Sequence, residues 1–408
     1  MDSKKLPARP SLEQYKKQAK DLLKSAKSGR RETLQITLQR IKKDHPRLGR
    51  LTDLELQGAQ LALSDAQLVI AREHGFESWP RFAKHIDGLT RQNSSVSKFE
   101  SAVDAVVAGD VAKLEQLLRE NPELVRERST FLHHATLLHY VGANGVENYR
   151  QKTPKNAVQI AEVLLRAGAD IHAVADIYGG SDTLGLAATS VHPFLAGVQD
   201  ALIDLLLQYG ASLNSERLVN ACLANGRGAA AEHLAKRGAP LDLEGAAGVG
   251  RLDLVETFLK EDGSWRTRAG QMERGFAWAC QYGRTKVVEF LLGHGLKMDA
   301  MPQGITGLHW AAHTARVDIV KLLLERKAPV ELRDGRHGGT PLGWALHGWA
   351  ECPQEPGPYY EVVALLVAAG ATVTSALPAD PRCKNHLLQK IGTDARMAAA
   401  LRGECRSQ

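Results

Sequence analysis

Several features common in membrane, secreted and metal-binding proteins are missing from this chain of 408 residues. Its five cysteines are odd in number and widely spaced, which argues against a disulfide framework and against a CxxC metal site. No apolar run reaches the roughly 18–20 residues that a membrane-spanning helix needs. The first twenty residues carry no apolar stretch after their charges, so we expect no signal peptide. Together these absences predict a cytoplasmic protein that does not enter a membrane.

Common nucleotide-binding and hydrolase motifs are also absent. The chain has no GxxxxGK[ST], no HExxH, no GxSxG and no GxGxxG after a predicted strand. His133 and His134 are adjacent, and neighbours on a helix point about 100° apart, which suits a metal ion poorly. We therefore expect no metal and no cofactor.

Positive charge is concentrated at one end of the chain. Residues 1–50 carry 15 Lys and Arg against 5 Asp and Glu, a balance of +10, whereas the rest carries 37 against 41, a balance of −4. A basic helix can contact nucleic acid or an acidic partner, or it can simply present a solvated face. Because neither interleaved aromatics nor a known DNA-binding motif accompanies the charge, we favour the solvated face over nucleic-acid binding.

What the sequence does contain is a repeat. Leucine-rich stretches that end in Gly-Ala or a variant recur, as in LLRAGAD, LLLQYGASLN, HLAKRGAPLD, FLLGHGLKMD, LLLERKAPVE and LLVAAGATV. Each follows an apolar pattern typical of an amphipathic helix, and a second, Ala-rich helix is predicted upstream of it. One such helix pair cannot bury its apolar face alone, so successive pairs must stack.

The segment ITGLHWAAHTARVDIVKLLLERKAPVELRD resembles an ankyrin repeat, in which T-P-L-H-x-A-A opens the first helix and V-x-x-L-L-x-x-G-A closes the second. GTPLGWAL and, less faithfully, TLLHYVGANG repeat the opening. The resemblance implies an all-α ankyrin-repeat solenoid of about eight helix-turn-helix repeats with capping helices at both ends. Repeat 2 carries the insertion GVENYRQKTPKN, and repeat 8 carries ECPQEPGPYY.

Three parts follow from this alignment: a basic helical extension over residues 1–90, a repeat array over 98–375, and a cap and tail over 376–408. In the extension, we predict a helix with Ser11 as its N-cap and Gly29 as its stop. The segments RPSLEQ and AREHGFESWPRF resemble the leader of many bacterial ankyrin-repeat proteins. We expect this leader to form a helical cap on the stack.

Some conspicuous residues have structural explanations. Cys222 and Cys280 occupy small positions in the Ala-rich helices, so we expect them to be core residues and not nucleophiles. His139 and His309 occupy the consensus His position of the ankyrin resemblance. That side chain usually bonds the backbone of a neighbouring turn, so we expect a structural role for both.

One column of equivalent positions stands out. The resemblance implies that the residue after the consensus His faces the concave groove, and in three consecutive repeats that residue is Trp278, Trp310 and Trp344. Three of six Trp residues in one column predict a wall of indoles. Gly245 and Gly248, one repeat earlier, predict a gap beside the wall. A concave, aromatic-lined surface of this kind is the usual form of a ligand site.

Other candidates extend this site along the groove and its rim. Asp176, Tyr178, Asp334 and His337 lie in predicted finger turns, and Tyr359 and Tyr360 could cover the site. The binding candidates are Tyr140, Tyr178, Trp278, Trp310, His313, Trp344, His347 and Trp349. The candidates for acid or base chemistry are His313, His347, Glu351, Asp104 and Asp176.

Two classes of function remain open. A groove with Trp anchors suits a partner protein, because Trp, Tyr and Arg dominate interface hot spots. The alternative is a small-molecule receptor or an atypical enzyme, in which the indoles hold a flat, sugar-like or cationic ligand and the imidazoles and carboxylates exchange protons. Since no residue pair has a spacing specific to a reaction, we favour a non-catalytic binding module.

Overall fold

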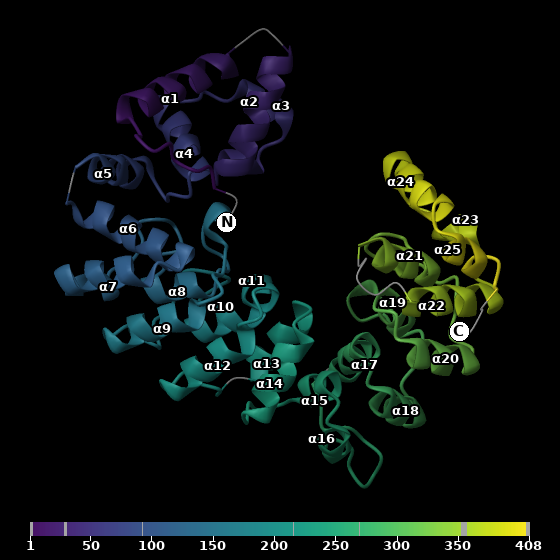
Figure 1. The fold of residues 1–408 in the computed structure, drawn as a ribbon. Helices are drawn as coiled ribbons and strands as arrows, with labels where there is room; N and C mark the ends of the chain where they lie inside the picture. The colour runs from purple at the N-terminus through teal and green to yellow at the C-terminus, as the bar shows by residue number, and fades with distance from the viewer. Residues whose placement is uncertain are drawn as a thin grey trace. The chain divides into compact units, whose positions relative to one another are not determined.

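A computed structural model describes residues 3–27, 31–91, 93–214, 216–268, 270–351 and 357–404. In these ranges every regular element is a helix, and two isolated β-bridges join Ala175 to Ser181 and Leu259 to Trp265. The chain forms two compact units, Met1–Ser212 and Leu213–Gln408. Figure 1 shows the helices of both units in chain order.

Five helices form the first part of the amino-terminal unit: α1 (Leu12–Ala26), α2 (Arg31–Asp44), α3 (Asp53–Gly58), α4 (Leu63–Glu73) and α5 (Trp79–Thr90). In α1, Tyr15, Ala19 and Leu22 share one face and are buried, which explains why this strongly basic segment folds. Ser11 occupies the N-cap position as predicted, although its side chain makes no capping hydrogen bond. The predicted stop at Gly29 lies outside the described residues.

The extension and the first repeats share one core. The ring of Phe76, after α4, lies 4.5 Å from that of Phe131. The Leu132 N–H donates to the Gly75 carbonyl over 2.8 Å. These contacts show that the extension packs on the repeats of its own unit. The boundaries at 90, 98 and 375 remain a prediction.

The rest of the amino-terminal unit consists of helix pairs: α6 (Ser95–Ala108) with α7 (Val111–Glu120), α8 (Leu137–Val141) with α9 (Ala157–Arg166), and α10 (Thr183–Thr189) with α12 (Gln199–Gln208). The five-residue helix α11 (Val191–Leu195) is inserted into the last pair. Short 3-10 turns lie at Leu48–Arg50, Pro122–Val125 and Asn148–Arg150.

The carboxyl-terminal unit continues the same plan with α13 (Glu216–Ala224), α14 (Gly228–Lys236), α15 (Leu243–Val249), α16 (Leu252–Thr257), α17 (Gln271–Tyr282), α18 (Thr285–Gly293), α19 (Gly307–His313), α20 (Val317–Glu325), α21 (Pro341–Glu351) and α22 (Gly357–Ala368). A 3-10 turn lies at Pro302–Gly304, and three helices close the unit: α23 (Val373–Ala376), α24 (Pro381–Gly392) and α25 (Ala395–Ala400). The described residues thus contain three helix pairs in the amino-terminal unit and five in the carboxyl-terminal unit, and the predicted all-α solenoid architecture is confirmed.

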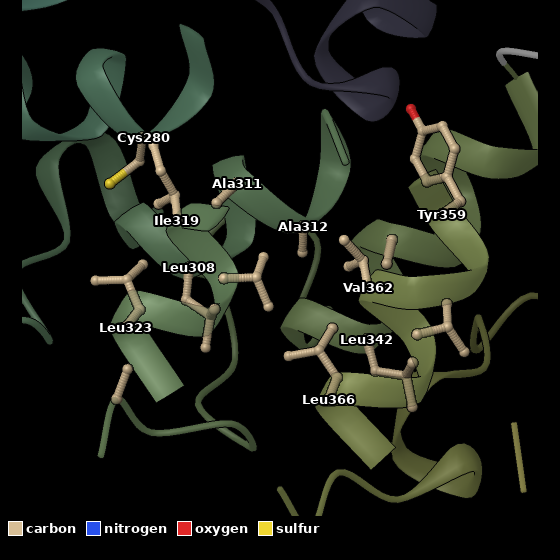
Figure 2. Packing of buried hydrophobic residues seen from close by; sticks show 14 of the residues in the cluster. Cys280, Leu308, Ala311, Ala312, Ile319, Leu323, Leu342, Tyr359, Val362 and Leu366 are labelled. Carbon is tan, nitrogen blue, oxygen red and sulfur yellow. The ribbon is translucent and has the colours of Figure 1, made fainter. Parts of the chain in front are cut away.

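Small residues let the inner helices of this unit approach one another. Ala311 and Ala312 of α19 are fully buried, and Figure 2 shows Ala311 beside Ile319 and Ala312 on the side of Val362. A Cβ on Gly307 would lie 2.6 Å from the Phe276 ring, so only glycine fits there. Cys222 and Cys280 are buried, as predicted, and burial raises the pKa of the Cys222 thiol to about 12.

The consensus histidines join each inner helix to the next finger turn. The His139 Nε2–H donates to the Ala173 carbonyl over 2.9 Å, and the His309 Nε2–H donates to the Gly339 carbonyl over 3.1 Å. In both, a threonine hydroxyl lies 2.7 Å from Nδ1. The predicted structural role of these histidines is confirmed.

Arginines make a second connection between consecutive repeats. Arg284, which follows α17, donates from Nε to the Gly248 carbonyl of α15 over 3.0 Å. Arg316, which follows α19, donates from Nε to the Gln281 carbonyl of α17 over 3.0 Å. Each guanidinium therefore satisfies a carbonyl at the end of the preceding inner helix, where no intrahelical donor is available.

Candidate functional site

The inner helices α19 and α21 bring two indoles and two imidazoles together. The ring centroids of Trp310 and Trp344 are 5.3 Å apart at an interplanar angle of 76°. His313 lies 5.4 Å from the Trp344 ring and 5.6 Å from the His347 ring. Trp310, His313 and Trp344 are half-buried and His347 is exposed, so these four side chains, which we call the aromatic patch, reach solvent.

A buried carboxylate holds one indole in place. Asp334 is 4% exposed, and its Oδ1 accepts the backbone N–H groups of Arg336 and His337 over 2.8 and 2.7 Å. Its Oδ2 accepts the Gly339 N–H over 2.7 Å and the Trp344 indole N–H over 3.0 Å. Burial opposes the charged form, yet these donors lower the pKa of Asp334 to about 2. Asp334 is therefore ionised at neutral pH, and it orients the Trp344 ring.

The imidazole of His313 is uncharged at neutral pH. Burial lowers its pKa, the Trp344 carbonyl 3.4 Å from Nδ1 acts in the opposite direction, and the neighbouring His347 lowers it further. The Tyr359 hydroxyl donates to the His313 carbonyl over 2.9 Å. Among the described residues, no carboxylate is bonded to His313 or His347, so the patch lacks an acid–base pair.

Two predicted members of the Trp wall lie elsewhere. Trp278 on α17 is half-buried, but among the described residues its ring contacts neither Trp310 nor Trp344. Trp349 is only 3% exposed and lies under the ammonium of Lys390, 5.0 Å from its ring centroid. The prediction of Trp349 as a surface contact is therefore wrong, because its place on α21 turns the indole toward α24. Tyr359 is buried beside Gly348 and does not cover the site.

The predicted gap at Gly245 and Gly248 is filled by neighbouring side chains. A Cβ on Gly245 would lie 3.0 Å from Asn220 Oδ1, and one on Gly248 would collide with Leu223. Both neighbours belong to α13. These glycines allow the close approach of two inner helices, so they do not create a concavity beside the indoles.

The equivalent position in the amino-terminal unit is covered. Tyr140 is 0% exposed, and its hydroxyl donates to Glu147 Oε1 over 3.2 Å. Glu147 belongs to the insertion of repeat 2, as does Arg150. Tyr140 was predicted to line the groove, and this prediction is wrong because the insertion folds over the ring.

Arg150 lies at the centre of a buried charge cluster under this insertion. Its Nη1 lies 2.6 Å from Glu100 and 3.3 Å from Glu147, and its Nη2 lies 2.7 Å from Asp104. His133 Nε2 lies 3.5 Å from Glu147 Oε2. Asp104, a predicted acid–base residue, is thus held in an ion pair. The sequence indicated the insertion but not the partners of Glu100, Glu147 and Arg150.

Asp176 and Tyr178 also lie in the amino-terminal unit. Asp176 Oδ2 accepts the His134 Nδ1–H over 2.7 Å, while Arg81 Nη1 donates to His134 Nε2 over 2.8 Å. Both ring nitrogens of His134 are therefore hydrogen-bonded within the chain. Tyr178 is 74% exposed, and its hydroxyl donates to Asn144 Oδ1 over 2.9 Å. Glu351 is exposed near the end of α21.

A cavity among the described residues lies away from the aromatic patch. It measures about 450 Å³ and is lined by Leu292, Leu296, Lys297, Met298, Asp299, Arg326, Lys327 and Pro329. None of these is a predicted site residue. Within the described ranges no group of three or more His, Cys, Asp or Glu side chains could hold a metal ion. None of the helices described there is long and apolar enough to cross a membrane.

Comparison with known proteins detects ankyrin repeats in the carboxyl-terminal unit. The sequence profile described as ankyrin repeats (three copies) matches residues 243–334 and 276–376. The all-α solenoid therefore contains ankyrin repeats, as the resemblance implied. One similar relative is the Palmitoyltransferase Hip14 of Drosophila melanogaster, which is 33% identical over 108 residues. The match spans 26% of this chain and 14% of that protein, so the relative's named activity does not carry over.

Proposed function

We propose that this chain is a protein-binding module whose main anchor is the aromatic patch on α19 and α21. Ankyrin repeats typically present an inner-helix face and finger turns to a partner, and here that face carries a perpendicular pair of half-buried indoles 5.3 Å apart. Trp residues dominate interface hot spots, because they bury a large area and their few torsions cost little entropy to fix. The pair of Trp310 and Trp344 is the observation that carries the proposal.

Preorganisation supports the same conclusion. The indole N–H of Trp344 is held by Asp334 over 3.0 Å, and its ring packs 5.8 Å from the buried His309. A partner that binds here finds the side chain already ordered, so the entropic cost of association is reduced.

The alternatives of catalysis and small-molecule binding receive less support. The acid–base candidates are divided between the two units, and Asp104 and Asp176 are each held by a basic side chain. The four oxygen contacts of Asp334 are all made within the chain. We also place the module in the cytoplasm, because Cys383 is both exposed and free, as a reducing compartment allows.

A peptide-display selection tests the proposal. The full chain would be immobilised and screened against random twelve-residue peptides, and selected peptides would be measured by fluorescence polarisation. We expect Trp310→Ala and Trp344→Ala to weaken binding about 30-fold or more, as loss of a hot-spot residue does. Trp278→Ala is the matched control, because it removes a half-buried indole of the same column outside the ring pair, and we expect less than about threefold loss.

Circular dichroism on each variant would show that the fold is retained. Selected peptides that bind Trp310→Ala and Trp344→Ala as tightly as the wild type would refute the proposal.

A further inference from the structure

The finger turn beside the aromatic patch, residues 331–340, directs its positive charges outward. Arg333 and Arg336 are exposed, whereas Asp334 is turned inward against Trp344. Glu331 faces the next repeat, where its Oε1 accepts the Thr372 N–H over 2.6 Å and its Oε2 accepts the Ser375 hydroxyl over 2.6 Å. The tip of this turn therefore presents cations to solvent.

The guanidiniums are ordered by neutral acceptors. Arg336 donates from Nε to the Gln303 carbonyl and from Nη2 to Gln303 Oε1, each over 3.0 Å. Arg333 donates from Nη1 to the Gly338 carbonyl over 2.6 Å. Within the part of the chain that the structure describes, neither arginine forms an ion pair. Both charges remain available to a ligand, although both side chains are already positioned.

Two neighbouring finger turns are also fixed to each other. The Gly335 N–H donates to the Gly304 carbonyl over 2.7 Å. A Cβ on Gly304, whose φ is +82°, would lie 3.3 Å from the Gly335 Cα, so the two backbones touch. Arg336 and Gln303 extend this contact outward. The charged rim is thus a paired structure and not a single loose turn.

The cationic rim and the aromatic patch form one continuous surface. The same Asp334 carboxylate accepts the Arg336 N–H through one oxygen and the Trp344 indole N–H through the other. The His337 ring lies 6.3 Å from the Trp344 ring. A ligand that packs on the indoles therefore passes directly beside two unpaired guanidiniums.

We propose that the partner segment is an extended acidic peptide: an apolar or aromatic side chain packs on Trp310 and Trp344, and carboxylates on either side of it pair with Arg333 and Arg336. This inference rests on the proposed function and adds the chemical class of the partner. Arginine suits the role, because its planar fork binds carboxylates through two parallel hydrogen bonds. The same rim disfavours a cationic ligand, although the indoles alone would attract one.

The composition of peptides selected in the display experiment tests this inference. We expect Asp and Glu to be enriched near an apolar anchor when the wild-type chain is used. The enrichment should disappear with the double variant Arg333→Gln, Arg336→Gln, which keeps hydrogen-bond donors but removes both charges. Arg326→Gln, an exposed arginine at the end of α20, is the matched control and should leave the enrichment unchanged.

One selected peptide would then be synthesised in three forms: as selected, with Asn and Gln in place of Asp and Glu, and with phosphoserine at the acidic positions. We expect at least a tenfold loss of affinity for the amide form and for the double variant, and a smaller difference at high salt. Peptides that depend on Trp310 but show no acidic enrichment would overturn the inference and leave the proposed function standing. A phosphoserine form that binds at least tenfold more tightly would also overturn it, in favour of a phosphopeptide partner.

Discussion

The inner helices α8 and α19, in different units, begin with the same pattern, TLLH from Thr136 and TGLH from Thr306. In both, a threonine hydroxyl lies 2.7 Å from the following histidine, which bonds the next finger turn. The residue after the histidine is aromatic in both. Tyr140 is fully buried, however, whereas Trp310 is half-buried and reaches solvent.

The difference arises outside the helices. Repeat 2 inserts a segment whose Glu147 and Arg150 close over Tyr140, while the corresponding connection after α19 is short. The repeat pattern fixes the direction in which a side chain points. What lies over that side chain depends on whether an insertion folds back. The same repeat position can therefore be core in one unit and a binding surface in the other.

The largest expected effect comes from removing the charge that holds this insertion. Arg150→Ala leaves Glu100 and Glu147 buried without a counter-charge, which should lower the free energy of unfolding of the amino-terminal unit by about 3–5 kcal/mol. Urea denaturation followed by hydrogen exchange with mass spectrometry would assign the loss to this unit. The control is Arg166→Ala, which breaks an exposed pair with Glu162 and should cost less than about 0.5 kcal/mol. Equal losses for the two variants would contradict the buried-cluster explanation.

The difference in burial between Tyr140 and Trp310 can be tested by replacing each aromatic side chain with alanine. Tyr140→Ala should cost about 3–5 kcal/mol, because it empties a buried site and removes a hydrogen bond to Glu147. Trp310→Ala should cost about 1–2 kcal/mol, since much of that ring already faces water. Chemical denaturation of both variants gives the two values. A larger loss at Trp310 than at Tyr140 would mean that the two aromatic positions do not differ in burial as described.

A pH effect should appear in the amino-terminal unit. Burial raises the pKa of Glu100 to about 7; Arg150 opposes this shift and Glu147 adds to it. Because this pKa is above the ordinary value of 4.5, the stabilisation is complete below pH 4.5 and is lost as the pH rises through 7. The buried His85 and His139, whose pKa values burial lowers to about 4, act in the opposite direction. We therefore expect the stability difference between the wild type and Glu100→Gln, which isolates the Glu100 contribution, to fall by up to about 3 kcal/mol between pH 4.5 and 8.

Glu100→Gln removes this contribution, and thermal denaturation of both chains across the pH range would measure the difference. Glu123→Gln, at an exposed position on the same unit, is the control and should leave the slope unchanged. A stability difference between the wild type and Glu100→Gln that rises over this range would refute the assigned direction.

The smallest expected effect concerns the turn that follows each outer helix. Five of these turns place glycine at a φ between +91° and +100°, namely Gly168, Gly210, Gly238, Gly295 and Gly370. The equivalent Lys327 has a φ of +64°, a conformation that costs an L residue about 1 kcal/mol. Lys327→Gly should therefore raise the free energy of unfolding by up to about 0.5 kcal/mol in a urea titration, after the greater backbone entropy of glycine is subtracted. If Lys327→Gly instead lowers the free energy of unfolding, the lysine side chain makes contacts whose stabilisation exceeds the cost of its backbone strain.

Local patterns were enough to predict the stack. The all-α solenoid, the buried Cys222 and Cys280, and the backbone-bonding His139 and His309 all follow from residues a few positions apart within a repeat. The pairing of Trp310 with Trp344 follows equally, because equivalent residues on stacked helices lie roughly 10 Å apart along the stack and large side chains bridge that distance.

Other outcomes depend on contacts that no local pattern encodes. Tyr140 was misplaced because its cover comes from an insertion, and Trp349 because its cover comes from Lys390 on a later helix. The glycine gap failed because Asn220 and Leu223, from a preceding repeat, fill it. Asp334 was predicted only at the rim, and its bond to the Trp344 indole depends on how the finger turn folds back.

The two arginine connections in the carboxyl-terminal unit run in the same direction along the chain, from a later repeat to the one before it. Arg284 and Arg316 each reach backward to a carbonyl of the preceding inner helix, so these two repeats each complete the one before them. A chain shortened at its carboxyl end so that it lacks such an arginine would leave the preceding inner helix with an unsatisfied carbonyl and a frayed end. A chain shortened at its amino end would lose the helix that carries this carbonyl but would keep the arginine. During synthesis from the amino end, the ends of α15 and α17 therefore gain these donors only after Arg284 and Arg316 have emerged.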